Sequence, residues 1–448
     1  MAYDLVIKNG RLITAHSDFT ADVAVSGESI AAIGRGLSAA REIDAAGCYV
    51  LPGAIDGHLH FTDPTFPPYA VPAADSFATG SRAGAFGGVT TVIDFAQPAV
   101  GQPLLEELDR RLADAAGQSV IDYGLHLNLR DPDPARLAEF PEVLRRGVPS
   151  FKLYTAYPGY RLPDAAIFLA MQQLGKLGGL AVLHAEDDDL IEALRAQFAA
   201  EGKTGPRWHA AVCPPAGEAE SIQRVAAYAQ VAGVRLLVFH ISCGEGVDVI
   251  RQAKARGQAV YGEAVAHNLV LTDEALQADT LFAEHLMVRP PIRDGAQQGA
   301  LWRGLADGGL DIVSTDHCPR VPVDGVQPRG AAGIETRLAL MHHFGVRAGR
   351  LSLPQWVAAC CTRPAEIFDL PRKGRLNPGC DADLVIFDPE KVMALEPANL
   401  HSPLPYSTYT GITVQGFPVT TISRGDVIVD HGQWLGRAGR GRFLERGH

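Results

Sequence analysis

The sequence of 448 residues lacks the usual features of membrane and secreted proteins. No uninterrupted apolar stretch approaches the roughly 18–20 residues that a membrane-spanning helix needs. The first ten residues do not have the basic-then-apolar layout of a signal peptide. The seven cysteines are scattered and include no Cys-x-x-Cys pair, which fits reduced thiols better than a disulfide framework. We therefore expect a soluble, cytoplasmic protein with no membrane partner.

Positive charge is also in short supply. The chain has 40 Lys and Arg residues against 51 Asp and Glu, a formal net charge of −11, whereas a nucleic-acid-binding surface needs the opposite sign. No Gly-x-Gly-x-x-Gly or Walker-type loop follows a predicted strand, so nothing indicates a nucleotide cofactor. The 47% of hydrophobic and 20% of charged residues are ordinary for a globular protein and exclude a disordered chain.

Short apolar runs separated by turns make up both ends of the chain. Residues 1–52 contain such runs with hairpin signals at Asn9-Gly10 and Gly27-Glu28, and the same texture returns in residues 373–448. We predict that 1–52 and 373–448 form one composite β-sandwich domain, which includes a C-terminal tail. Two unrelated β caps are the alternative.

Between these ends, over residues 53–372, short apolar runs alternate with segments of helical pattern. Eight β-then-α units predict a (β/α)8 TIM barrel, whose active site lies at the carboxyl ends of the strands. A doubly wound open sheet is the competing architecture. The predicted strands are residues 54–58, 91–95, 123–127, 150–154, 180–184, 236–240, 259–263 and 311–315.

Five of the eight predicted strands carry a potential metal ligand at or near their ends. In a closed barrel these ends converge on one mouth, and the two histidines of a His-x-His pair point to the same side of a strand. Four imidazoles and a carboxylate suit zinc or another borderline transition metal better than calcium or magnesium. Taken singly, each histidine is more often a structural residue. The candidate ligands are His58, His60, Lys152, His184, His240 and Asp316.

Lys152 has two interpretations. It is flanked by Phe151 and Leu153. In the first interpretation the side chain faces outward and reaches solvent. In the second it is buried, and its neutral amine has reacted with carbon dioxide. The resulting carbamate would bridge two metal ions. Sequence periodicity does not decide between the two.

Several segments around these residues form recognisable motifs, namely residues 51–60, 86–95, 150–152, 183–186, 314–319, 333–337, 374–384 and 439–444. The first, Leu-Pro-Gly-Ala-Ile-Asp-Gly-His-Leu-His, resembles the opening metal motif of the amidohydrolase superfamily. The set as a whole is similar to the dihydropyrimidinase/hydantoinase branch, the cyclic amidohydrolases, over nearly the whole chain.

The resemblance implies a pair of divalent metal ions, most consistent with Zn²⁺, bridged by N6-carboxylated Lys152. One ion would take His58, His60, the carbamate and Asp316, and the other the carbamate with His184 and His240. A hydroxide bridging the ions would attack the ring carbonyl, with Asp316 as general base and then general acid. Tyr157 matches the family tyrosine that hydrogen-bonds the oxyanion, although Tyr154 or Tyr160 could fill that role.

The chain departs from the family pattern at two substrate-binding positions. Arg289 stands where relatives usually carry Ser before a Pro-Pro pair, and Arg329 where they carry Asn before the glycine of the next motif. The family holds the cyclic amide at these positions largely through main-chain groups. The two arginines either recognise a carboxylate or second carbonyl of the substrate, or point to solvent. We expect loops 63–75 and 320–332 to set selectivity.

We interpret the chain as a zinc-dependent hydrolase that opens a dihydropyrimidine or hydantoin ring to an N-carbamoyl amino acid. Allantoinase and dihydroorotase are the nearest alternatives, although Thr62 replaces the arginine usual in dihydroorotases. A catalytically silent scaffold relative and a single-metal deaminase are more remote. The partner would be a small cyclic amide or ureide, with no nucleic acid. The resemblance also implies a homo-oligomer, a tetramer or a dimer.

Overall fold

Eight parallel strands form the barrel at the centre of the computed structural model, which describes residues 3–62, 73–278, 280–320 and 329–447. Neighbouring strands pair in chain order, and the ring closes through a bridge between Leu59 and His317. All eight predicted strands are present, so the barrel is confirmed and the open sheet is excluded. The strands are β6 (Ala54–Asp56), β7 (Val89–Ala96), β8 (Asp122–Asn128), β9 (Ser150–Tyr154), β10 (Leu180–His184), β11 (Arg235–Val238), β12 (Val260–Val265) and β13 (Ile312–Ser314).

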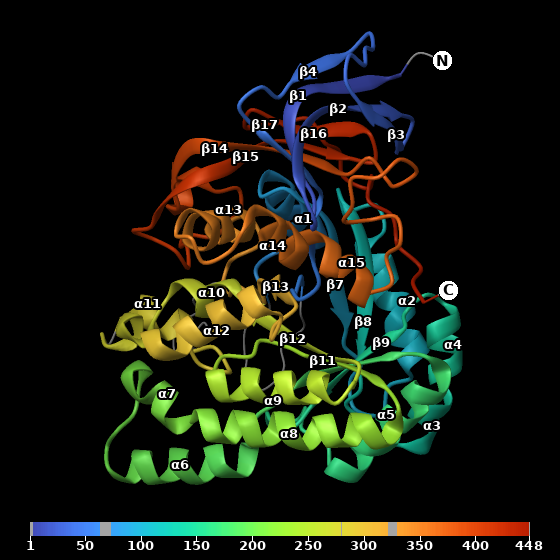
Figure 1. The fold of residues 1–448 in the computed structure, drawn as a ribbon. Coiled ribbons are helices and arrows are strands. Elements are labelled where there is room, and N and C mark those ends of the chain that lie inside the picture. Colours follow the sequence, from blue (N-terminus) through green and yellow to red (C-terminus); the bar gives the residue numbers. More distant parts are fainter. Residues whose placement is uncertain (1–2, 63–72, 279, 321–328, 448) are drawn as a thin grey trace.

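Helices follow the barrel strands and cover their outer faces (Figure 1). Glycines with positive φ end two of them, since Gly178 (φ 73°) and Gly233 (φ 65°) follow α5 and α8 in a conformation that other residues adopt at a cost. Among the described residues, no helix combines the length and apolar character needed to cross a membrane. The helices are α1 (Phe77–Phe86), α2 (Leu104–Ala115), α3 (Pro134–Ala138), α4 (Phe140–Arg145), α5 (Asp164–Leu177), α6 (Asp188–Ala200), α7 (His209–Val212), α8 (Pro215–Ala232), α9 (Gly244–Ala255), α10 (Ala266–Val270), α11 (Leu281–His285), α12 (Gly295–Asp307), α13 (Arg337–Leu340), α14 (Leu353–Val357) and α15 (Arg363–Ile367).

Strands from the two ends of the chain lie side by side, blue beside red in Figure 1, and form one mixed sheet of nine strands. The junction between the halves is antiparallel pairing of β5 with β14, in which Val50 lies opposite Ile386. Two separate caps are thereby excluded. The strands are β1 (Leu5–Ile13), β2 (Asp18–Ser26), β3 (Ser29–Gly34), β4 (Glu42–Asp44), β5 (Tyr49–Pro52), β14 (Leu384–Ala394), β15 (Thr413–Ser423), β16 (Asp426–Asp430) and β17 (Gln433–Trp434).

The chain passes from the mixed sheet to the barrel at one residue. β5 ends at Pro52 and β6 begins at Ala54, and a Cβ atom on the intervening Gly53 would overlap the side chain of Thr90. Only glycine allows this close approach. We retain residues 1–52 with 373–448, and 53–372, as the proposed domain limits.

The C-terminal tail packs against the barrel strand β8. Phe443 forms a parallel bridge with Tyr123, and the Leu444 amide donates to the Tyr123 carbonyl at 2.7 Å. Arg446 is buried beyond it and donates to Ser150 Oγ at 3.0 Å. The tail therefore reaches the interior of the barrel from the side opposite to the carboxyl ends of the strands.

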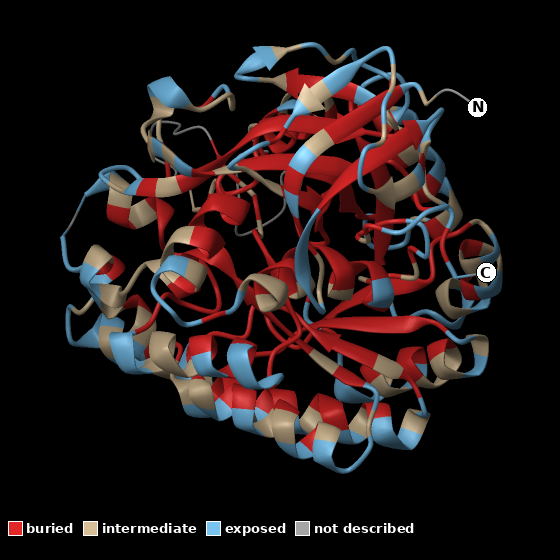
Figure 2. Cartoon of the chain, turned by 45° about the horizontal axis from the view of Figure 1, so that its top comes forward, coloured by how far each residue is buried: buried red, intermediate tan, exposed pale blue. Residues whose placement is uncertain are grey.

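The alternation of side chains along the barrel strands separates two layers of core. Figure 2 shows the strands buried and the outer faces of the helices exposed. In β9, Phe151 and Leu153 pack outward against the helices, which directs Ser150, Lys152 and Tyr154 to the barrel interior. Lys152 is 1% exposed, which excludes the first of its two interpretations, an outward-facing lysine that reaches solvent. Its apolar neighbours in the sequence belong to the other face of the strand.

A buried ionic cluster joins the barrel to the mixed sheet. The Lys373 ammonium lies 2.6 Å from Asp122 of β8 and 2.8 Å from Asp383, and Arg424 also pairs with Asp122 at 3.0 Å. Burial disfavours the charge of Lys373, but Asp383, Asp122 and Asp381 outweigh it and raise the pKa of the amine. The lysine is therefore charged and compensates two buried carboxylates.

Replacing Lys373 by Met is expected to destabilise the fold by about 3–5 kcal/mol, because the buried Asp383 loses its cationic partner and the buried Asp122 keeps only Arg424. Chemical denaturation measures the change in free energy of unfolding. The matched control is Lys203→Met, which removes an exposed lysine 2.6 Å from Glu201 and is expected to change little. Equal stability of the two variants would contradict a role for the cluster in holding the two parts together.

Candidate active site

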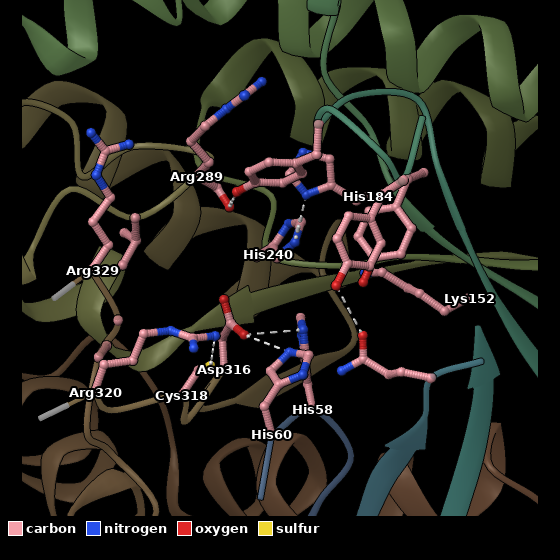
Figure 3. A pocket seen from close by; sticks show the side chains of 17 residues that line it. His58, His60, Lys152, His184, His240, Arg289, Asp316, Cys318, Arg320 and Arg329 are labelled. Atoms are coloured by element: carbon pink, nitrogen blue, oxygen red, sulfur yellow. Dashed lines mark hydrogen bonds and ion pairs between the residues drawn. The ribbon is translucent and has the colours of Figure 1, made fainter. Parts of the chain in front are cut away.

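Three of the predicted ligands form a compact group at the carboxyl ends of the strands. The Nε2 atoms of His58 and His60 both lie 3.3 Å from Oδ1 of Asp316 (Figure 3). All three ligand atoms lie within 4.8 Å of one another. The two histidines follow β6 and the aspartate follows β13, the strands at which the barrel closes. Closure of the barrel therefore brings together residues that are more than 250 positions apart in the chain.

A second pair of ligand candidates lies across the pocket. Nδ1 of His184, at the end of β10, is 3.0 Å from Nε2 of His240, which follows β11. Burial lowers the pKa of both imidazoles, so each carries a lone pair at neutral pH. Two ring nitrogens directed at one point form the kind of donor pair that a transition metal takes.

Lys152 lines the same pocket as both groups. Its Nζ is buried and has no hydrogen-bond partner among the residues that the structure describes. Burial, opposed by the charges of Asp316 and Glu263, lowers its pKa to about 7. A buried ammonium without a hydrogen bond costs far more free energy than a buried neutral amine, which favours the neutral form of Lys152.

Two buried carboxylates fix the orientation of the imidazoles. Oε1 of Glu263, on β12, lies 2.7 Å from Nδ1 of His58 and accepts the backbone N–H of His240 at 3.1 Å. Oε2 of Glu186 lies 2.8 Å from Nε2 of His184. Each contact favours a proton on the ring nitrogen that faces the carboxylate, Nδ1 of His58 and Nε2 of His184. The other nitrogen of each ring then directs its lone pair into the pocket, where a metal ion can take it.

Asp316 is an anion at neutral pH. Burial opposes its ionisation, but the neighbouring His58, His60 and His240 hold the pKa of the carboxyl below its ordinary value. The backbone of Asp316 has φ 47°, and His240 (φ 41°) and Tyr157 (φ 82°) share this left-handed region. Such strain costs roughly 1–3 kcal/mol per residue and clusters at functional sites, where the surrounding structure maintains it.

Three tyrosines form one wall of the pocket. Tyr154, the last residue of β9, packs with Tyr157 and Tyr160, and all three line the cavity of about 90 Å³. The Tyr157 ring lies 4.8 Å from that of His184, and its hydroxyl reaches toward the carbonyl oxygen of Arg289 at 3.5 Å. Tyr160 instead directs its hydroxyl to Gln97 at 3.3 Å. Tyr157 is thus the tyrosine whose hydroxyl lies on the Arg289 side of the pocket.

The predicted arginines take different positions around the pocket. The guanidinium of Arg289 points away from Asp316 and lies 3.0 Å from Glu186 (Figure 3). Arg329 also lines the pocket and is partly exposed. Arg289 is buried, so the expectation that it points to solvent is wrong. Much of the two loops expected to set selectivity, residues 63–72 and 321–328, lies outside the described residues.

Sequence reasoning missed two residues at the site. Arg320 lines the pocket beside Cys318, to whose sulfur it donates at 3.3 Å, and was considered only as the start of a loop. Glu263 stood at the end of a predicted strand, yet nothing in its sequence marked it as the partner of His58. A charged residue closing an otherwise apolar barrel strand was the available signal.

The donor set fits a pair of divalent metal ions. Four imidazoles, one aspartate and the Lys152 amine line one cavity, and carboxylates orient the rings of His58 and His184 from outside. No described residue forms a hydrogen bond with that amine. Nitrogen donors with a carboxylate suit zinc and similar borderline ions. The group His58, His60 and Asp316 alone offers the three ligands of one such ion.

The comparisons with known proteins agree with this geometry. The chain is 38% identical over 456 residues to the D-hydantoinase of Ralstonia pickettii and, over 457 residues, to a D-phenylhydantoinase of Escherichia coli, with 99% of this chain and 98–99% of each relative covered. The crystal structure of a dihydropyrimidinase from Brevibacillus agri superposes with a TM-score of 0.95 at 35% identity, covering 99% of this chain and 98% of the other. The model of the amidohydrolase family matches residues 49–428. Because this match spans the whole barrel and the strands β5, β14 and β15 of the mixed sheet, the chain belongs to the amidohydrolase family.

Proposed function

We propose that the protein hydrolyses the ring amide of a hydantoin or dihydropyrimidine and releases an N-carbamoyl amino acid. The observation that carries the proposal is the convergence of five side chains around the buried Nζ of Lys152, which has no hydrogen-bond partner within the described part of the chain. The five are His58, His60, His184, His240 and Asp316. The relatives that share the whole length of the chain are named for hydantoins and dihydropyrimidines. All six ligand positions are kept, which argues against a silent scaffold.

The proposed cofactor is a pair of Zn²⁺ ions. His58, His60 and Asp316 would hold one, His184 and His240 the other, and carboxylated Lys152 would contact both. In the modification the Lys152 nitrogen forms a bond to the carbon of CO₂ and loses a proton, which leaves a carbamate anion. Ions bound there would supply a lowered pKa for water and polarisation of the ring carbonyl.

Asp316 is the proton carrier in this proposal. As an anion it accepts a proton from the attacking water and delivers it to the ring nitrogen as the carbon–nitrogen bond breaks. Tyr157 donates a hydrogen bond from its hydroxyl to the oxygen that becomes negative during attack. The main-chain carbonyl of Arg289 accepts an N–H of the ring, which places the amide between Tyr157 and Asp316.

Further expectations follow from the family. We infer a homo-oligomer, a tetramer or a dimer, and a cytoplasmic location, which suits the seven free cysteines. Allantoinase and dihydroorotase remain the alternatives within the same reaction class.

A ring-opening assay tests the proposal. Zinc-loaded protein supplied with bicarbonate is offered hydantoin, both enantiomers of a 5-substituted hydantoin, dihydrouracil, allantoin and dihydroorotate. We expect hydantoins and dihydrouracil to be converted to N-carbamoyl products, and the chelated apoprotein to be inactive. Product is identified by mass spectrometry, because the gain of one water distinguishes hydrolysis from other ring chemistry.

The ranking of substrates separates the alternatives. Highest turnover on allantoin or dihydroorotate would replace the proposed substrate while keeping the reaction. No turnover on any ring by protein that holds two zinc ions would overturn the proposed substrate class. A protein that binds no stoichiometric metal would instead favour the scaffold.

A further inference from the structure

The side chain of Arg289 is enclosed within the protein rather than offered to the pocket. Its guanidinium is 4% exposed, lies 3.0 Å from Oε2 of Glu186 and 3.6 Å from Oδ1 of Asp188. Figure 3 shows it directed away from Asp316, while the main-chain carbonyl of the same residue faces the tyrosine hydroxyl. The side chain and the main chain of Arg289 thus serve different neighbours.

The first of these neighbours connects Arg289 to a predicted metal ligand. The Glu186 oxygen that accepts from Arg289 is the one that contacts Nε2 of His184 at 2.8 Å. Because Glu186 is itself 1% exposed, its position depends on protein contacts and not on water. Arg289 supplies the charge that compensates this buried carboxylate, so the carboxylate can orient His184 toward His240.

The second neighbour connects Arg289 to the tyrosine of the pocket. Asp188 accepts the backbone N–H of Tyr157 at 3.2 Å, at a residue whose φ of 82° is unfavourable for a side chain. The guanidinium also stacks on the Tyr157 ring, with 4.5 Å between Cζ and the ring centre. Arg289 therefore touches both the ring of Tyr157 and the residue that holds its backbone.

We propose that Arg289 is a positioning residue that couples His184 to Tyr157 through Glu186 and Asp188, and that its guanidinium does not bind the substrate. The part concerning Tyr157 rests on the proposed function, whereas the part concerning His184 requires only that the site binds metal. A serine at this position, as the family pattern has, cannot reach these carboxylates. The sequence-based expectation that Arg289 recognises a substrate carboxylate is the competing account.

The test uses Arg289→Met, which keeps an unbranched apolar stem and removes the guanidinium with its charge and hydrogen bonds. We expect the affinity for zinc, measured by competition with a chromogenic chelator, to fall by about 10- to 100-fold. The visible absorption of the cobalt-substituted protein should change as well. With metal saturating, kcat should fall while KM changes little, and equally for neutral hydantoins and those with a carboxylate arm.

The matched control is Arg293→Met, in the same segment of chain. Arg293 is equally buried and pairs with Glu218 at 2.7 Å, but its hydrogen bonds go to Glu218, Ser242 and Cys213. Both variants are expected to lose thermal stability, and only Arg289→Met to lose metal affinity. Arg289→Lys keeps the positive charge but lacks the planar guanidinium, so it should retain part of the zinc affinity that Arg289→Met loses. It replaces Arg289→Met in the test if the Met variant does not fold.

A double-mutant cycle addresses the route of the coupling. Glu186→Gln should weaken zinc binding as Arg289→Met does. In the double variant the zinc affinity should fall by less than the product of the two single fold-changes. Unchanged metal affinity in Arg289→Met, with KM raised only for the carboxylate-bearing hydantoin, would show that Arg289 binds substrate and would overturn the inference. If no ring is hydrolysed but Arg289→Met still loses metal, the proposed function fails and this inference stands.

Discussion

Asp316→Asn is expected to lower kcat for ring opening by roughly 10³-fold. The amide has the shape of the carboxylate, so it can still lie beside His58 and His60, but it cannot accept a proton from water. Steady-state kinetics on the best ring substrate, with bound zinc counted in the same sample, measures the effect. Counting the metal separates the loss of a base from the loss of a ligand.

Asp311→Asn is the control for this substitution. Asp311 is also buried and lies next to β13, but at its amino end, where it pairs with Lys254 at 2.6 Å and Arg363 at 2.8 Å. Its replacement should reduce stability and leave kcat close to that of the unchanged protein. A kcat for Asp316→Asn within tenfold of that value, with metal fully bound, would exclude Asp316 as the proton carrier.

Lys152→Met is expected to abolish binding of the metal pair and to lower kcat/KM by roughly 10⁴-fold or more, the equivalent of several kcal/mol of transition-state stabilisation. Methionine fills the same buried volume, so the fold should persist. The two proposed sets of ligands would lose the group that we propose to contact both ions. Zinc analysis and circular dichroism of the same preparation check the two halves of the expectation.

The carbamate itself has a direct signature. Apoprotein reconstituted with zinc and isotope-labelled bicarbonate should incorporate one labelled carbon, seen by native mass spectrometry, and reconstitution in CO₂-free buffer should take up less zinc. The label should be absent from Lys152→Met and present in Lys254→Met, whose lysine pairs with Asp311 at 2.6 Å. Full zinc uptake and activity without CO₂ would mean that Lys152 acts without carboxylation.

The barrel and its ligand-bearing strand ends could be predicted from the sequence because both are local patterns. Residues 180–184 read as a short apolar run ending in His184, and β10 has those bounds. The convergence of His58 and Asp316 then follows from closure of the barrel, which orders strand ends without any knowledge of loops. The hairpin signal at Gly27-Glu28 is confirmed, because these residues connect β2 and β3. The turn predicted at Asn9-Gly10 is wrong, because both residues lie within β1, at an irregularity in its pairing with β2.

The orientation of the arginines could not be predicted in the same way. Arg289 lies in a connection between α11 and α12, where no periodicity defines the direction of a side chain. Its partner Glu186 belongs to a different connection, so their contact depends on how two irregular segments pack. For Lys152 the alternation of side chains along the strand was visible in the sequence. Which side faces the helices was not, because Phe151 and Leu153 can be assigned to the outer face only once the barrel is known.

The pairing of β5 with β14 has a consequence for how the protein is made. About 330 residues separate Pro52 from Leu384, and at about 5–20 residues per second a ribosome needs roughly 15–65 s to deliver the second strand after the first. During that interval the edge of β5 presents unpaired backbone groups to other chains. Translation speed and early chaperone contact with the first fifty residues should therefore affect how much of the mixed sheet forms correctly. The barrel should depend on them less, because its strands pair in the order of their synthesis.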